Sequence, residues 1–175
     1  MGKTTLVLGL GNILLGDEGV GARVAERLQA LYHFPEGTRV LEGGTLALDL
    51  LPDVEDTDRL LVIDAADMGA TPGEVVRIVD DEVPVFLSVK VSPHQMGLAD
   101  ILSAARLRGR APEELVLWGV QPGMIDASLE LSPPVAAQVD VLVDRVLADL
   151  GRWGIEPTRR LDHEQHGQSY DGTKG

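Results

Sequence analysis

Three side chains that could bind a divalent cation occupy comparable places in this sequence. Glu18 follows the first expected strand, Asp64 ends the third, and His94 lies in a loop before an expected helix. Two carboxylates and one imidazole suit nickel, zinc or another divalent transition metal better than magnesium or calcium, which prefer oxygen ligands throughout. Three protein ligands would leave positions open for a substrate group or a water molecule.

Each of these residues also has an ordinary structural role that the sequence leaves open. Asp17 or Glu18 could cap the following helix, because acids interact well with the amino-terminal end of a helix dipole. Asp64 could be a turn residue, since it opens the run Asp-Ala-Ala-Asp, and His94 could form a hydrogen bond only within its own loop. The cation site is therefore a hypothesis that requires the three elements to converge.

The glycine-rich loop at residues 9–18 follows the first expected strand, as a dinucleotide-binding loop would. That fingerprint requires a small residue at Leu14, where the helix must pack close to the strand and the pyrophosphate must meet the helix start. Glu42 does stand at the end of the second expected strand, where a ribose-binding acid would lie. A dinucleotide-binding protein is therefore the weaker alternative.

The spacing from Gly11 to Gly16 also resembles a P-loop. In a P-loop, Lys and Ser or Thr should follow, because the ammonium reaches the terminal phosphates and the hydroxyl holds magnesium. Asp17 and Glu18 follow here instead. Two carboxylates at that point would repel a phosphate and attract a cation, so the loop favours the opposite kind of ligand.

The elements that must position these residues alternate between strands and helices. The sequence predicts strands at 4–10, 38–41, 59–63 and 115–120, and β-rich stretches at 74–79 and 85–91, one of which could be antiparallel at a sheet edge. It predicts helices at 20–31, 46–51 (stopped by Pro52), 98–105 and 132–151, the last beginning at the N-cap Ser132 and closed by Gly151. We therefore expect an α/β fold of three layers, with a mostly parallel twisted sheet flanked by helices, as in phosphorylase/hydrolase-like folds. Ligands of such sheets bind outside the carboxyl ends of the strands.

Composition narrows the class of protein further. The 175 residues suit one domain, and 44% apolar with 3% aromatic residues favours a core of Leu, Val, Ile and Ala. A formal net charge of -13 disfavours nucleic acid as a partner. The absence of cysteine excludes disulfides, thiolate ligands and a cysteine nucleophile. No segment approaches the ~18 apolar residues that span a membrane, so we expect a soluble cytoplasmic protein.

The last residues differ in composition from the rest of the chain. From 157 to 175 the sequence is polar and rich in Gly, Gln, His and charge, which predicts a disordered tail after a single domain at 1–156. His163 and His166 in this tail are separated by only two residues, so they do not form the zincin motif, in which two His lie one helical turn apart.

Four segments of the chain resemble the endopeptidases that mature the large subunit of nickel-iron hydrogenases. The segments are residues 9–21 (GLGNILLGDEGVG), 42–45 (EGGT), 63–65 (IDA) and 92–100 (SPHQMGLAD). They occur in the family's order, and the resemblance extends from the first strand to about Trp153. It implies that Glu18, Asp64 and His94 bind the metal. The family often has Asp where this chain has Glu42, so a role for Glu42 in cleavage or substrate recognition follows less directly.

The resemblance also implies a substrate and a logic of recognition. The enzyme would remove a short carboxyl-terminal extension from the hydrogenase large-subunit precursor after nickel insertion. Nickel supplied by the precursor would complete its coordination with the three ligands, and other divalent transition metals could occupy the same site. We expect the metal to polarise the scissile carbonyl or activate water, with Asp64 or Glu18 as a base.

Two further expectations complete the sequence-based interpretation. We expect the protein to be a monomer that binds neither nucleic acid nor membrane. A nickel chaperone without peptidase activity would use the same three ligands and is the main alternative function, which only a cleavage assay separates from the enzyme.

Overall fold

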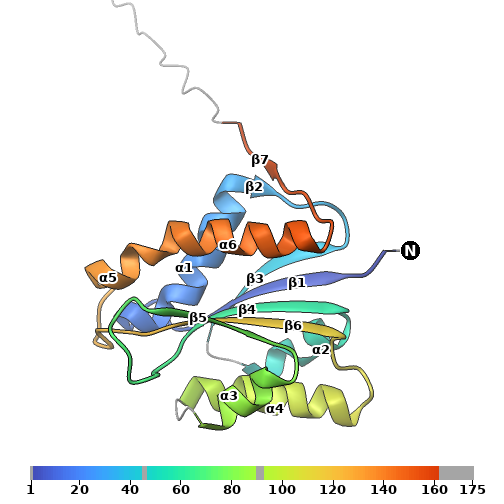
Figure 1. Ribbon diagram of the computed structural model, residues 1–175, viewed down its shortest axis with the longest axis horizontal. Coiled ribbons are helices and arrows are strands. Elements are labelled where there is room, and N and C mark those ends of the chain that lie inside the picture. The colour runs from blue at the N-terminus through green and yellow to red at the C-terminus, as the bar shows by residue number, and fades with distance from the viewer. Residues whose placement is uncertain (1, 45–46, 90–92, 162–175) are drawn as a thin grey trace, which may run out of the picture.

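The computed structural model describes residues 2–44, 47–89 and 93–161, and a five-stranded sheet lies at the centre of this part of the chain (Figure 1). The strand order is β3 (Thr38–Gly44), β1 (Thr5–Leu10), β4 (Arg59–Ala65), β6 (Glu114–Val120) and β5 (Val75–Val79). The first four strands are parallel to one another, and β5 pairs with β6 in the antiparallel direction at the edge of the sheet. The predicted α/β class, the mostly parallel sheet and the antiparallel edge strand are confirmed.

Helices cover both faces of this sheet, which gives the three predicted layers (Figure 1). One layer contains α1 (Val20–Leu31), α5 (Pro133–Ala136) and α6 (Gln138–Arg152). The other contains α2 (Leu51–Glu55), α3 (Glu82–Val89) and α4 (Pro93–Leu107), with the short 3-10 helix η2 (Ala47–Leu50) before α2. A second 3-10 helix, η1 (Gly16–Gly19), joins the glycine-rich loop to α1.

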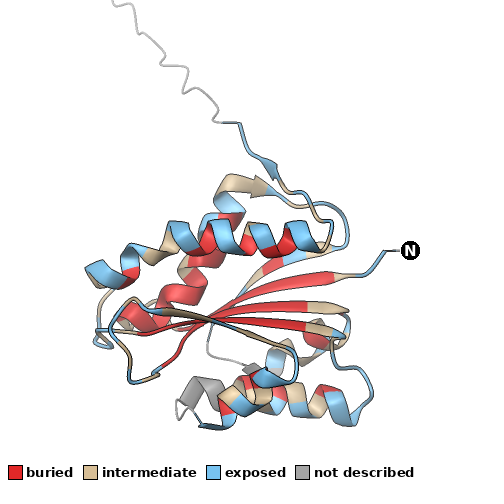
Figure 2. Ribbon diagram, viewed as in Figure 1, coloured by how far each residue is buried: buried red, intermediate tan, exposed pale blue. Residues whose placement is uncertain are grey.

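The central strands are buried on both faces, which explains their continuous apolar sequences (Figure 2). Side chains alternate across a strand, so Val7 of β1 packs with the α1 and α6 layer, whereas Leu6 and Leu8 pack with the α3 and α4 layer. Each fully buried Leu or Val contributes roughly 1.5–3 kcal/mol relative to an exposed one. The two hydrophobic cores therefore hold the strand ends in fixed positions.

The prediction of a β-rich stretch at 85–91 is wrong, because the described part of that stretch belongs to the helix α3. Val83 and Leu87 lie one helical turn apart and are both buried, which is the spacing of a helix that packs one face on a sheet. Pro84 is in the first turn, where its missing N–H breaks no intrahelical hydrogen bond. Local content of β-branched residues had favoured a strand, but tertiary packing overrides that preference.

The ends of other helices also differ from the prediction. Pro52 lies in the first turn of α2 instead of ending a helix, which suits a residue without an N–H. The segment at 93–95 was predicted as a loop, but α4 begins at Pro93. The predicted helix at 132–151 is divided into α5 and α6 at Ala137, and it continues to Arg152.

The polar segment after residue 156 begins with a short strand. β7 (Thr158–Arg159) pairs in the antiparallel direction with β2 (Tyr32–His33), and the Arg160 guanidinium donates to the carbonyl oxygen of Gln29 at 3.0 Å. The prediction of a disordered tail from 157 onward is therefore wrong at its start. The rest of that prediction, with His163 and His166, falls on residues outside those the structure describes. Within the described ranges, no helix is both long and apolar enough to cross a membrane.

Candidate active site

Glu18 and Asp64 are brought together at the carboxyl edge of the sheet. Strands β1 and β4 are parallel neighbours, with Gly9 opposite Ile63, so both end at the same edge. Asp64 is the next residue of β4, and the glycine-rich loop after β1 leads into η1, which lies against β4 and contains Glu18. Both side chains are buried, Asp64 to 3% exposure and Glu18 to 8%. The predicted convergence of the two acids is therefore seen in the fold.

The glycines of this loop let backbone approach backbone. A Cβ atom at Gly11, whose φ is 123°, would overlap the carbonyl oxygen of Glu18, and one at Gly21 would overlap those of Ile63 and Leu10. Only glycine permits such close packing of η1 and α1 against the strand ends. Contacts within the protein's own backbone are therefore enough to require these glycines.

Asp64 has an unusual electrostatic environment. The pKa of its carboxyl group is raised to about 8, chiefly by burial and to a smaller extent by the neighbouring Glu18 carboxylate, while a hydrogen bond from the backbone N–H of Ala65 acts in the opposite direction. Its Oδ2 atom is buried and has no hydrogen-bond partner among the described residues. A buried carboxylate is costly unless a positive charge or a donor compensates it. Two such acids side by side are a donor set that a divalent cation fits.

Asp17 is neither a cation ligand nor a helix cap. It is fully buried, and its carboxylate accepts hydrogen bonds from the backbone N–H groups of Gly123 (2.8 Å), Met124 (2.7 Å) and Ser132 (2.7 Å) and from the Ser132 hydroxyl (2.6 Å). These four donors hold the pKa of Asp17 below its ordinary value although burial acts in the opposite direction. Its four hydrogen bonds all go to residues outside η1 and α1, so the capping alternative is wrong for Asp17, while that for Glu18 stays open.

His94 lies in the first turn of α4, but its side chain falls outside the described residues. Among the side chains that the structure describes, no group of three His, Cys, Asp or Glu could hold a metal ion. The two acids therefore need a further ligand, and His94 in that role stays a prediction.

Glu42 lies on β3, the strand beside β1, opposite Gly9 in the parallel register. It is exposed, and the pKa of its carboxyl group is raised by partial burial and by the Glu26 carboxylate, while Arg23 lowers it. It is thus at the same sheet edge as Glu18 but in a more open environment. Its predicted part in cleavage or recognition stays a prediction.

Sequence reasoning missed Gln121, which follows β6 at the same edge. Its Oε1 atom accepts hydrogen bonds from the backbone N–H groups of Met68 (2.6 Å) and Ala70 (3.1 Å), and its Nε2 donates to Asp67 (3.2 Å). The buried amide thereby holds the loop that follows Asp64. Nothing local in the sequence indicates this contact, since its partners lie more than 50 residues away.

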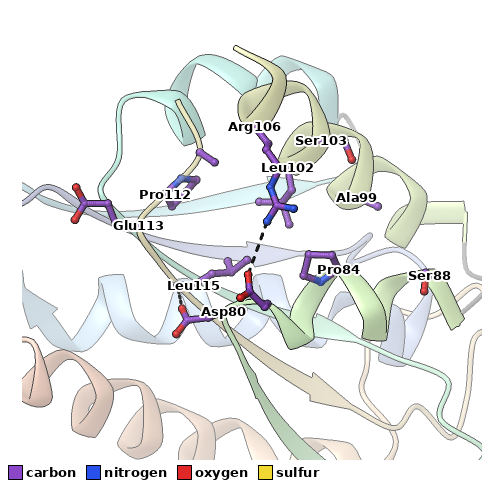
Figure 3. Close-up of a pocket in the computed structure, with 12 residues that line it drawn as sticks. Asp80, Pro84, Ser88, Ala99, Leu102, Ser103, Arg106, Pro112, Glu113 and Leu115 are labelled. Atoms are coloured by element: carbon purple, nitrogen blue, oxygen red, sulfur yellow. Dashed lines mark hydrogen bonds and ion pairs between the residues drawn. The ribbon is translucent and has the colours of Figure 1, made fainter. Parts of the chain in front are cut away.

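A cavity of about 300 Å³ lies elsewhere, between α3, α4 and the start of β6 (Figure 3). Leu115, at the beginning of β6, lines it together with Pro84 and Leu102, whereas Asp64 is paired with Gly119 near the end of β6. The cavity is therefore separated from the buried acids by most of the length of a strand, and we do not assign the chemistry to it.

The fold and the buried acids are accompanied by a match to one protein family. Residues 22–149 match the model of the hydrogenase maturation protease family. The hydrogenase 2 maturation protease of Escherichia coli (strain K12) is 42% identical over 156 residues, which cover 89% of this chain and 95% of that protein. A hydrogenase expression/formation protein of Rhodobacter capsulatus is 43% identical over 159 residues, covering 90% and 76%. The solved structure of a hydrogenase maturating endopeptidase from E. coli superposes with a TM-score of 0.86 at 41% identity, covering 90% and 98%.

The chain therefore belongs to the hydrogenase maturation protease family. The resemblance found in the sequence is confirmed, and the protein is classed with the hydrolases.

Proposed function

We propose that this protein removes the carboxyl-terminal extension of a nickel-iron hydrogenase large-subunit precursor after nickel has been inserted, and that it recognises the nickel held by the precursor. One observation supports this most directly. Glu18 and Asp64 are buried side by side at the carboxyl edge of the sheet, and Asp64 Oδ2 lacks a hydrogen-bond partner among the described residues. Such an arrangement is stable only when a cation or a proton compensates the charge.

The proposed roles follow from the positions of the residues. Glu18, Asp64 and His94 would hold the nickel of the precursor, which is part of the substrate and not a resident cofactor. When bound, a divalent metal supplies Lewis acidity that polarises a carbonyl group or lowers the pKa of water. Asp64 or Glu18, ionised once the metal has displaced any proton, would assist as the general base.

The loops beside Glu18 and Asp64 would hold these two side chains in position. Gln121 holds the backbone after Asp64, and the glycines at 11 and 21 let η1 and α1 pack against the strand ends. Rigid support of this kind lets two charged groups keep a fixed separation, which metal binding and proton transfer both require. We further propose that the protein works as a monomer in the cytoplasm.

The direct test is incubation with precursor that has been loaded with nickel and with precursor that is nickel-free. Mass spectrometry of the large subunit should show a shortened carboxyl terminus only with the loaded precursor. The Asp144→Asn variant serves as a control, because that carboxylate is exposed on α6, and it should process like the wild type. Cleavage of both precursors alike would overturn nickel recognition, and nickel binding without any cleavage would favour a nickel chaperone.

A further inference from the structure

The loop at residues 122–132, called here the clamped loop, is fixed to the turn that carries Glu18. The Asp17 carboxylate accepts four hydrogen bonds from Gly123, Met124 and Ser132, so it holds both ends of the loop. Asp17 comes directly before Glu18 in η1. The position of the loop is therefore set relative to the candidate active site by a fully buried charge.

Backbone hydrogen bonds join the middle of the clamped loop to the same turn. The N–H of Gly16 donates to Ser128 O at 2.8 Å, the N–H of Ser128 donates to Leu14 O at 3.0 Å, and the N–H of Asp17 donates to Met124 O at 2.9 Å. Residues 14–17 and the clamped loop are thus joined into one hydrogen-bonded unit, which ends one residue before Glu18.

This surface presents large apolar side chains to solvent. Leu14 is 59% exposed, Ile125 53% and Leu129 63%. Single exposed apolar residues are common, but these three belong to segments that hydrogen bonds join next to the turn of Glu18, and loops beside a site often carry binding residues. They contribute little to the cores of the protein, because much of each side chain stays in water.

Leu129 also lines an open groove of about 480 Å³ that continues from the clamped loop between α1 and the start of α6. Leu131 and Val139 add apolar surface to it, and Arg23 lines it while donating to the carbonyl oxygen of Leu129 at 2.9 Å. Charged side chains (Glu26, Arg27 and Glu130) also line the groove, which follows α1 away from η1 and so has the elongated form that an extended ligand requires.

We propose that the clamped loop, with Leu14, Ile125 and Leu129, and the adjoining groove bind an extended, apolar segment of the precursor next to the scissile bond. This inference rests on the proposed function. An extended chain advances about 3.3 Å per residue, so residues within about three of a bond held at Glu18 lie within ~10 Å of it. The exposed acids Asp126 and Glu130 on the same loop disfavour an acidic segment.

The test replaces the three apolar residues by serine, Leu14→Ser, Ile125→Ser and Leu129→Ser, singly and together. Because all three are exposed, each variant should unfold within a few degrees of the wild-type melting temperature, which thermal unfolding verifies. The matched control is Leu107→Ser at the end of α4, where the leucine is 89% exposed. KM and kcat are measured with nickel-loaded precursor, and precursor binding is measured separately by titration.

The triple variant should raise KM by about tenfold or more while kcat changes by less than about threefold, since apolar interface residues contribute chiefly to binding. Leu107→Ser should leave both constants unchanged. Equal KM values for the triple variant and the control would overturn the proposal. It would also be overturned if the wild type were a dimer and the triple variant a monomer with the same KM. If the wild type binds the precursor without cutting it, the proposed function is refuted. The proposed docking surface is still supported in that case if the triple variant no longer binds the precursor.

Discussion

Asp17 and Asp64 lie at the same edge of the sheet, but they differ in how far hydrogen bonds within the protein stabilise the charge of the carboxylate. Asp17 accepts four hydrogen bonds from the clamped loop, and its pKa is lowered. Asp64 is almost as deeply buried, but its pKa is raised to about 8 and its Oδ2 has no partner among the described residues. The fold compensates the first charge internally, whereas the second requires compensation from outside. This contrast separates a structural acid from a functional one more clearly than burial does.

The largest expected effect concerns the two acids that we propose as metal ligands. Replacing Asp64 by Asn, or Glu18 by Gln, should lower the rate of precursor processing by about a hundredfold or more, because loss of a metal ligand costs at least as much as loss of the groups that orient it. Rates are measured from the appearance of shortened large subunit at saturating nickel-loaded precursor. Wild-type rates in either variant would remove that residue from the site.

Stability should respond to the two acids in opposite directions. Asp17→Asn should lower the free energy of unfolding by about 2–4 kcal/mol. The NH2 group of the new side chain would face N–H donors of the clamped loop, which would then lose their buried acceptor. Asp64→Asn should leave the metal-free protein as stable as the wild type or more stable, since the amide cannot ionise in the buried site. Urea unfolding in metal-free buffer measures both. A destabilised Asp64→Asn variant would mean that the fold itself uses that charge.

The pH dependence of stability should show the same contrast. The contribution of Asp64 is fully present below its unfolded pKa of 3.8 and is lost as the pH rises toward its folded pKa of about 8. The contribution of Asp17 is present above its unfolded pKa and is lost on acidification. The stability of Asp64→Asn relative to the wild type should therefore grow between about pH 5 and about pH 8, by no more than about 1.4 kcal/mol per pH unit, and then level off. A difference that stays constant over this range would contradict the raised pKa.

Glu42 should show the smallest effect of the acids at this edge. It is exposed, so Glu42→Gln should change stability by less than about 0.5 kcal/mol. We expect the processing rate to fall by about tenfold or less. An exposed carboxylate is screened by water, so it interacts more weakly with a charged partner than a buried carboxylate does. A loss as large as that of Asp64→Asn would instead place Glu42 among the catalytic groups.

The parts of the site that could be predicted are those that depend on local pattern. The apolar run of β1 and the Asp that ends β4 could be read directly, because buried parallel strands are continuous in sequence and end at the same edge. Glu18 followed from the charge that replaces the Lys and Ser or Thr of a P-loop. These features need no knowledge of distant residues.

The parts that were missed depend on long-range contacts. The donors to Asp17 lie more than 100 residues away in sequence, so the residue seemed to be a helix cap. The pairing of β7 with β2 likewise joins segments that no local pattern connects. The helix α3 was mistaken for a strand because its valines favour β structure, while burial of Val83 and Leu87 on the sheet decides its conformation.

The central claim is that Glu18 and Asp64 form a cation site, and calorimetric titration with nickel tests it most directly. If Asp64 holds a proton at neutral pH, nickel binding to the wild type should release about one proton, seen as a dependence of the heat on the ionisation enthalpy of the buffer. Asp64→Asn should abolish this release and weaken binding by about a hundredfold, whereas Asp144→Asn should match the wild type. Unchanged nickel affinity and unchanged proton release in Asp64→Asn would contradict the account.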